Sequence, residues 1–246
     1  MVYDAARPGY PEGLVLELRR VGFLHPGGIV ADLGTGTGLL AECFVSAGHR
    51  TLGVEPNVEM LDLARERFSE NPLFEAIEGR AESTGLDDGS IDLVVAGQAF
   101  HWFEPHAVRA ELDRILRPGG AAAWIWNARH EMGTPFLEDY EALLQRFGSD
   151  YNQVKARYAD PVALEIVAGG PVGPPLGLPN RQLLDRNGFK ARLESSSYLP
   201  RSGEPAYALL MEEADRIFDR HARNNRVELV YTTEIYGRPP ASTHGG

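Results

Sequence analysis

The sequence predicts an α/β fold, in which a doubly wound, Rossmann-like and mostly parallel sheet carries a helical cap insertion. Helical and strand patterns alternate from residue 11 to about 127, a glycine-rich turn follows the first strand pattern, and a Gly/Pro loop interrupts the second half at 168–179. Strands separated by helices require right-handed crossovers, which place helices on both faces of a parallel sheet. Ligands of such sheets bind beyond the carboxyl ends of the strands.

Five strands are predicted in the first half, each a short apolar run bounded by turn residues. They lie at 27–34, 50–56, within 72–82, at 90–98 and at 121–127. Helices with apolar residues at helical spacing are predicted at 11–22, 39–48, 57–68 and 106–120. Pro11 suits a first helical position and Asn57 a helix cap, while Pro118 and the two glycines after it stop the last of these helices.

The second half is less regular, and a single domain spanning 1–246 is the simplest prediction. Residues 131–168 have a helical pattern, followed by a helix at 180–189, a strand at 190–199, a long helix at 204–225 and a strand at 226–237. We expect a core formed by 1–130 and 179–238, a cap inserted at 131–178, and a flexible tail at 239–246.

The composition narrows the classes of partner. Lys and Arg number 24 against 35 Asp and Glu, and the resulting net charge of −11 repels nucleic acid and anionic membrane surfaces. No apolar run is long enough for a membrane span, and the first residues lack the apolar core of a signal peptide. The single cysteine, Cys43, excludes an intrachain disulfide. We therefore expect a cytoplasmic protein, monomeric or homodimeric, that acts on a small molecule.

The turn "VADLGTGTGLL" places Gly34, Gly36 and Gly38 between the first strand and the next helix. Glycines there permit a tight turn and a close approach of the backbone to a ligand. Read from Gly36, the turn also fits the loose G-x-G-x-x-A form of dinucleotide sites. Asp32 argues against a dinucleotide, because its negative charge beside the turn would repel a pyrophosphate. A ligand with an amine or another cation is favoured instead.

Two further acids follow the next strands. Glu55 closes the second strand about 20 residues past the turn, where an acid can accept both hydroxyls of a ribose. Ala81 and Glu82 end the third strand, where an adenine ring would lie. Together with Asp32 and the glycines, these residues describe a ligand that contains adenosine but no phosphate. S-adenosyl-L-methionine, with S-adenosyl-L-homocysteine as its product, fits that description.

The motifs in their order along the chain resemble class I S-adenosylmethionine-dependent methyltransferases. They are ADLGTGTG, GVEPN, GRAE, IDLVVAGQAFHWF, RILRPGG and WIWNARH. More narrowly, "QAFHWF", "WNAR" and the opening "YDAARPGYP" resemble the small-molecule group that includes trans-aconitate methyltransferase-like proteins. The resemblance is specific over 1–130 and thin over 180–238. It implies a seven-stranded sheet, and it implies that this chain begins within a leader that is usually longer.

The resemblance also assigns roles to the end of the fourth strand and its surroundings. Gln98 and Ala99 approach the sulfur side of the cofactor, and His101 and Trp102 help wall the acceptor pocket. Tyr3, Arg7 and Tyr10 fold over the opening, where Arg7 can clamp a carboxylate. The predicted cofactor-binding residues are Tyr3, Arg7, Asp32, Gly34, Thr35, Gly36, Gly38, Glu55, Pro56, Met60, Ala81, Glu82, Gln98 and Ala99. The predicted substrate-binding residues are Tyr10, His101, Trp102, Asn127 and Arg129.

The chemistry leaves the acceptor open. A carboxylate accepts a methyl group without a base, whereas a hydroxyl needs one, and His101 is then the predicted catalytic residue. A packed strand–helix junction is the alternative interpretation of the aromatic residues. A non-catalytic cofactor-binding protein is the alternative function, and a nicotinamide-dependent oxidoreductase is disfavoured by Asp32 and by the missing Tyr-x-x-x-Lys pair. No metal site is predicted, since His101 and His106 are five residues apart.

Overall fold

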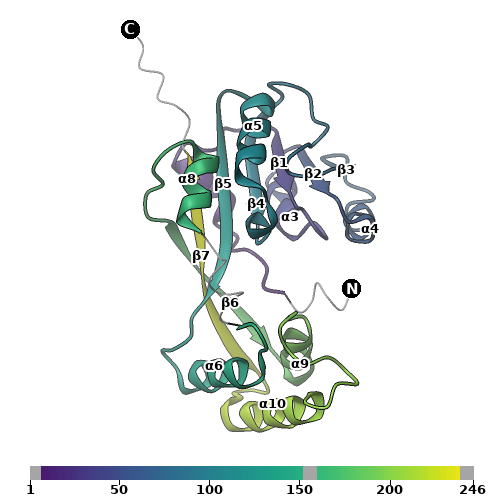
Figure 1. Cartoon of the computed structure of the whole chain (residues 1–246), viewed down its shortest axis with the longest axis vertical. Helices are drawn as coiled ribbons and strands as arrows, with labels where there is room; N and C mark the ends of the chain where they lie inside the picture. The colour runs from purple at the N-terminus through teal and green to yellow at the C-terminus, as the bar shows by residue number, and fades with distance from the viewer. Residues whose placement is uncertain (1–6, 152–159, 239–246) are drawn as a thin grey trace. The chain divides into compact units, whose positions relative to one another are not determined.

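A seven-stranded sheet organises the computed structural model, which describes residues 7–151 and 160–238 (Figure 1). Its strand order is β3-β2-β1-β4-β5-β7-β6, with β7 antiparallel. The strands are β1 (Val30–Leu33), β2 (Thr51–Glu55), β3 (Phe74–Glu78), β4 (Ile91–Gly97), β5 (Leu116–Arg129), β6 (Leu176–Leu184) and β7 (Val227–Arg238). Strands β1 to β5 pair in parallel, as the alternating pattern predicts. The doubly wound fold class is confirmed.

The helices alternate with the first five strands and then cluster in the second half. They are α2 (Leu14–Arg20), α3 (Leu39–Ser46), α4 (Val58–Arg67), η1 (Phe100–Trp102), α5 (Pro105–Ile115), α6 (Pro135–Phe147), α8 (Pro161–Ala168), α9 (Arg186–Glu194) and α10 (Tyr207–His221). Asn57 caps α4 as expected, because its side chain accepts a hydrogen bond from the Met60 N–H at 3.1 Å. Within the described residues, no helix is both long and apolar enough to cross a membrane.

The segment 176–194 reverses the predicted order of helix and strand. Residues 180–184 belong to β6, where they alternate between exposed and more buried positions. The helix α9 follows at 186–194, so that it takes the end of the predicted helix and the first half of the predicted strand. Asp185 begins this helix by accepting a hydrogen bond from the Gly188 N–H at 2.8 Å, and Phe189 and Leu193 then bury one face at a spacing of four residues. Asp185 lies inside the segment that was predicted as a helix. The helical spacing of the apolar residues there concealed that a new helix begins at this residue.

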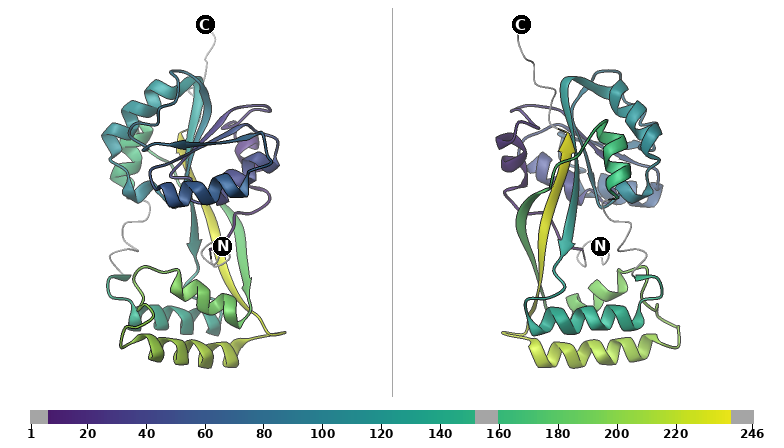
Figure 2. Two further views of the ribbon diagram at one scale, coloured as in Figure 1. Left: turned by 90° about the vertical axis from the view of Figure 1, so that its right-hand side faces the viewer. Right: turned by 60° about the vertical axis from the view of Figure 1, so that its left-hand side comes forward.

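The chain divides into two compact units. The sheet unit comprises 10–126, 160–178 and 233–238 of the described residues, and the helical unit comprises 7–9, 127–151 and 179–232. Strands β5, β6 and β7 contribute residues to both units. This division differs from the expected cap at 131–178, because α6 packs with α10 in the helical unit while α8 packs on α5 in the sheet unit (Figure 2). The expected tail lies outside the described residues.

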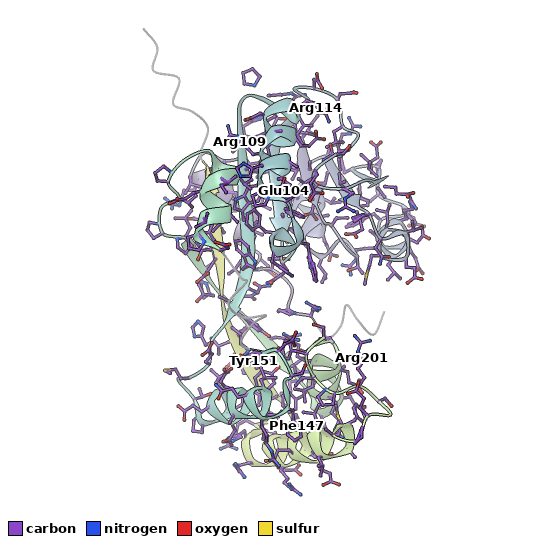
Figure 3. All side chains as sticks on the ribbon, viewed as in Figure 1. Glu104, Arg109, Arg114, Phe147, Tyr151 and Arg201 are labelled. Carbon is purple, nitrogen blue, oxygen red and sulfur yellow. The ribbon has the colours of Figure 1, made fainter. Side chains whose placement is uncertain are left out.

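Contacts from each helix explain that division. In the sheet unit, Arg109 of α5 donates from Nη1 to the carbonyl oxygen of Val167 in α8 at 3.4 Å (Figure 3). In the helical unit, the ring of Phe136 in α6 meets that of Phe189 in α9 at 5.7 Å between centroids, and α10 contributes Phe218. Each unit therefore has an apolar core of its own.

An ion pair between the buried Glu111 and the partly exposed Arg114 holds the helix α5 within the sheet unit. Glu111 is buried and accepts hydrogen bonds from the N–H and the hydroxyl of Thr84, at 2.8 and 2.6 Å. Arg114 donates to both oxygens of the same carboxylate, from Nη2 at 2.7 Å and from Nε at 2.9 Å. The bonds from Arg114, aided by Thr84 and opposed by burial, lower the pKa of Glu111 to about 2.

We predict that Glu111→Gln removes an acid-sensitive part of the stability. Because the pKa of Glu111 lies below its unfolded value, the gain is present above that unfolded value and is lost as the pH falls from about 5 to about 2. With solvent screening at Arg114, whose side chain is 36% exposed, the loss is about 1–3 kcal/mol. Urea unfolding at pH 7 and pH 3 measures it, with Glu75→Gln on the surface as the control. An unchanged pH dependence in Glu111→Gln would contradict this assignment.

Candidate functional site

The glycine turn adopts the conformation that its sequence requires. Gly34, Gly36 and Gly38 have positive φ angles of 71°, 57° and 85°, which favour glycine. A Cβ on Gly34 would lie 2.6 Å from the Cβ of Ala99, so the turn packs directly against the end of β4. A Cβ on Gly36 would meet nothing within 4 Å. The turn is therefore closed toward β4 and open at its middle glycine.

Asp32 lies in β1 beneath this turn and is fully buried. Its Oδ2 accepts a hydrogen bond from the Thr35 hydroxyl at 2.7 Å, while Oδ1 has no hydrogen-bond partner within 7–151 and 160–238. Burial raises the pKa of Asp32 to about 7, against the opposing effects of Thr35 and of the backbone at Ala41. A buried carboxylate with a vacant oxygen is costly unless a donor reaches it. This atom fits a ligand that carries an amine.

Glu55 braces the turn from the end of β2. Its Oε2 accepts from the Gly36 N–H at 2.9 Å, and its Oε1 accepts from the Asn57 N–H at 3.0 Å. Each carboxylate oxygen has about two lone-pair sites, so further donors such as ribose hydroxyls can still bind. Pro56 follows directly at an exposed position, and Met60 is partly buried in the next helix. Glu55 thus closes β2, as the sequence predicted.

The loop after β3 is tied to the start of α5. Ala81 is buried, whereas Glu82 accepts a hydrogen bond from the Glu104 N–H at 3.0 Å and lies 3.5 Å from Nε of Arg80. Glu104 in turn caps α5 by accepting from the N–H groups of His106 and Ala107 (Figure 3). The sequence predicted a cofactor role for Glu82 but not this bond to the start of α5.

The aromatic residues that follow β4 differ in their exposure to solvent. Phe100 is buried and stacks on Trp124 at 5.3 Å between ring centroids, as a packed junction requires. Trp102 is 76% exposed, and the His101 ring lies 4.8 Å from it. Gln98 has a φ of 59°, a strained backbone conformation for a residue that is not glycine. Such strain gathers at ligand sites, and here it follows the last residue of β4.

Tyr10 reaches the same strand end within the sheet unit. Its hydroxyl lies 2.3 Å from where a Cβ on Gly97 would stand, so only glycine admits the tyrosine here. Glycine at the end of β4 thus has a packing reason that the sequence alone did not reveal. Tyr3, the other tyrosine of the opening segment with a predicted role, lies outside the described residues.

The other predicted residues belong to the helical unit. Arg7 donates to the Ser195 carbonyl oxygen at 3.3 Å, and Asn127 donates to the Gly9 carbonyl oxygen at 3.1 Å. Arg129 is only 11% exposed and pairs with Glu141 and with the Tyr151 hydroxyl. These contacts occupy Arg129 within its own unit, so its predicted role toward an acceptor gains no support from them.

The structure brings together the ends of β1, β2 and β4, which carry most of the predicted cofactor residues. Direct contacts join them, from Gly36 to Glu55 and from Gly34 to Ala99. Sequence reasoning missed two interior polar residues of the helical unit, Tyr140 and Arg192. A charged residue near the apolar face of a short helix, one turn after Phe189, was the available signal for Arg192.

The sequence of this chain matches those of known methyltransferases. Residues 31–124 match the family model described as a methyltransferase domain. An uncharacterised methyltransferase of Mycobacterium tuberculosis is 39% identical over 131 residues, which cover 52% of this chain and 50% of that protein. A Saccharomyces cerevisiae protein that bears the name of an S-adenosylmethionine-dependent methyltransferase is 27% identical over 147 residues, covering 57% and 48% of the two chains. The chain thus spans about half the length of these curated relatives.

A solved structure extends the likeness of fold over nearly the whole chain. It is a candidate type II methyltransferase from Anaeromyxobacter dehalogenans, with a TM-score of 0.67 and 20% identity over 95% of this chain and 97% of that one. The sheet order 3-2-1-4-5-7-6 with an antiparallel β7 is typical of class I methyltransferases. Residues 31–124 thus match a methyltransferase domain, and the sheet has the strand order of the class I methyltransferase fold.

Proposed function

We propose that this chain transfers the methyl group of S-adenosyl-L-methionine to an oxygen atom of a small-molecule acceptor. The buried Asp32 carboxylate carries the proposal, because its Oδ1 has no partner in the described part of the chain. An ammonium group can donate to that oxygen and offset the cost of burying the charge. A pyrophosphate in the same place would be repelled, which disfavours a nicotinamide cofactor.

Each of the remaining residues at the strand ends would contact a different part of the cofactor. Glu55 would accept the ribose hydroxyls, the open backbone at Gly36 would lie against the ligand, and Ala81 with Glu82 would border the adenine. Gln98 and Ala99 would lie toward the methionine part. The bound cofactor supplies a sulfonium, whose methyl group is already attached to a good leaving group. Residues of this chain then have to orient the acceptor and exclude water, which together contribute about 7–11 kcal/mol.

The chemical class of the acceptor oxygen determines whether His101 is needed as a general base. A carboxylate attacks in its ionised form and needs no base, whereas a hydroxyl must lose a proton as it attacks. A positioned base contributes about 3–5 kcal/mol, and His101 is the candidate beside the strained Gln98. The narrower resemblance to trans-aconitate methyltransferase-like proteins supports a carboxylate among the acceptors.

A search for turnover tests the proposal directly. The full chain is incubated with S-adenosyl-L-methionine and fractions of a small-molecule extract, and S-adenosyl-L-homocysteine and methylated products are measured by mass spectrometry. We expect product that depends on one fraction. Tight binding of S-adenosyl-L-methionine with no turnover in any fraction would make the chain a non-catalytic binding protein.

We predict that Asp32→Asn removes a pH dependence of ligand binding. With a pKa of about 7, Asp32 is mostly protonated at pH 6, and an ammonium ligand favours its charged form. The affinity of the wild-type chain for S-adenosyl-L-homocysteine should therefore rise from pH 6 to pH 7.5, while the α-amino group of the ligand is still charged. Calorimetry should find that Asp32→Asn binds about tenfold or more weakly and without this rise.

Methylthioadenosine, which lacks the amino acid part, is the matched control ligand. Its affinity should change little with pH in either protein. A rise of equal size in the wild-type chain and in Asp32→Asn would contradict the role of Asp32.

We predict that His101→Ala separates the two kinds of acceptor. With a hydroxyl acceptor, turnover should fall about a hundredfold or more while cofactor affinity changes little. With a carboxylate acceptor, the same change should mainly raise KM. Steady-state kinetics with the acceptor found above distinguishes these results. If kcat, KM and cofactor affinity are all unchanged, His101 only packs against Trp102.

A further inference from the structure

A pocket of about 410 Å³ opens in the sheet unit at the amino ends of β4 and β5. Its wall combines apolar side chains, among them Phe23 and Leu24 after α2, with charged ones from three elements. The charged residues that line it are Arg19, His25, Asp92 and Arg117. Ligand sites have volumes of about 300–1,000 Å³ and walls that are apolar except for a few placed polar groups. The pocket therefore has the size and the lining of a small-molecule site.

This pocket is separate from the candidate site at the other end of the strands. Asp92 is the second residue of β4, whereas Gly97 ends that strand beside Tyr10. A strand rises about 3.3 Å per residue, so Asp92 and Gly97 stand about 17 Å apart. A ligand held in the pocket is therefore distinct from one bound at the carboxyl end of β4.

One carboxylate, that of Asp92, lines the pocket, and it is already engaged. It accepts from the Ile29 N–H and from Nη1 of Arg117, both at 2.7 Å, and its Oδ1 lies 3.2 Å from Nε2 of His25. The other ring nitrogen of His25, Nδ1, lies 3.0 Å from the Pro26 carbonyl oxygen. Two acceptors favour an imidazole that is protonated at both nitrogens, so Pro26 and Asp92 raise the pKa of His25. Asp92 is thus shared between two cationic side chains.

Arg19 contributes a charge that no acid among the described residues balances. Its Nη2 donates to the Ala47 carbonyl oxygen at 3.3 Å and to Nε2 of His49. His49 is fully buried, and its Nδ1 donates to the Gly28 carbonyl oxygen at 2.8 Å, so its Nε2 is the acceptor of a neutral ring. Both partners of Arg19 are neutral, and they fix the guanidinium at the pocket wall. Counting His25, three cations line a pocket with one carboxylate, although the whole chain has a net charge of −11.

We propose that this pocket binds a small organic acid, with its carboxylate against Arg19 and its apolar part along Phe23 and Leu24. A guanidinium matches a carboxylate in charge and in hydrogen-bonding geometry. The apolar side chains favour a ligand with a hydrocarbon part over a bare inorganic anion. Asp92 disfavours a phosphate dianion further, because it places a negative charge on the same wall. This binding is independent of the proposed function and needs no methyl transfer.

Calorimetry of the full chain with benzoate and hexanoate at pH 7 tests the proposal. Benzamide is the neutral control of the same shape as benzoate, and inorganic phosphate is the anion without an apolar part. We expect saturable binding of at least one of the two acids, none of benzamide and weaker binding of phosphate. Arg19→Gln should weaken the binding of the acid about tenfold or more. Arg20→Gln is the matched control, since Arg20 is the next residue of α2 but pairs with Glu17 outside the pocket, and it should change nothing.

Two exposed residues keep the test valid if Arg19→Gln fails to fold. The side chains of His25 and Arg117 are 64% and 42% exposed, so their replacement leaves the apolar core intact. Arg117→Gln should weaken the binding of the acid several-fold, because it removes a cation and leaves Asp92 with one partner fewer.

The dependence of binding on pH gives a second readout at His25. Benzoate stays ionised between pH 8 and pH 6, whereas His25 gains its charge as the pH falls over that interval. Asp92 of β4 and Arg117 of β5, which face His25, keep their charges, and burial lowers the pKa of His49 so that its ring stays neutral. Benzoate affinity of the wild-type chain should therefore rise several-fold from pH 8 to pH 6, and His25→Gln should lack this rise.

Three results would overturn the proposal. The first is that neither acid binds the wild-type chain saturably, and the second is that Arg20→Gln weakens binding as much as Arg19→Gln does. The third is that phosphate binds more tightly than both acids, which would contradict the ligand class. Saturating S-adenosyl-L-homocysteine should leave benzoate affinity unchanged, because the two sites are separate. Competition between these ligands would place benzoate at the carboxyl end of β4 and contradict the assignment to this pocket.

Discussion

The candidate site of the sheet unit depends on the hydrogen bond that the Gly36 N–H donates to Glu55. It joins the turn after β1 to the end of β2, so that the backbone at Gly36 stays open while Asp32 is enclosed beneath it. The positive φ angles of the turn admit glycine with little strain, and Ala99 fits against Gly34 only because no Cβ is present. We therefore expect the local backbone geometry of the turn to set where a ligand lies.

The pKa of a buried carboxyl group shifts in opposite directions at two places in this chain. Glu111 is buried with all its oxygens engaged, so its charge stabilises the fold and its pKa falls. Asp32 is buried and one of its oxygens has no partner among the described residues. Burial therefore raises its pKa. Tyr140 follows the second pattern in the helical unit. We propose that the unpartnered oxygen of Asp32 marks a ligand-binding position, whereas the engaged carboxylate of Glu111 holds the fold.

Much of the sheet unit could be predicted from local sequence. The alternation of patterns predicted the parallel strands β1 to β5, and Asn57 predicted the start of α4, because both depend on neighbours close in the chain. The order of β6 and α9 could not be predicted, since the Asp185 cap lies within a stretch whose leucines also suit a helix. The packing of Tyr140 against Phe189 could not be predicted either. The contact of Tyr140 with Phe189 depends on α6 and α9 packing across about fifty residues of chain.

Calorimetry of the full chain with S-adenosyl-L-methionine and, separately, with nicotinamide adenine dinucleotide tests the central claim most directly. If a buried Asp32 beside the braced turn selects an amine over a pyrophosphate, S-adenosyl-L-methionine should bind saturably and the dinucleotide at least about a hundredfold more weakly. Equal affinity for the two ligands would contradict the account.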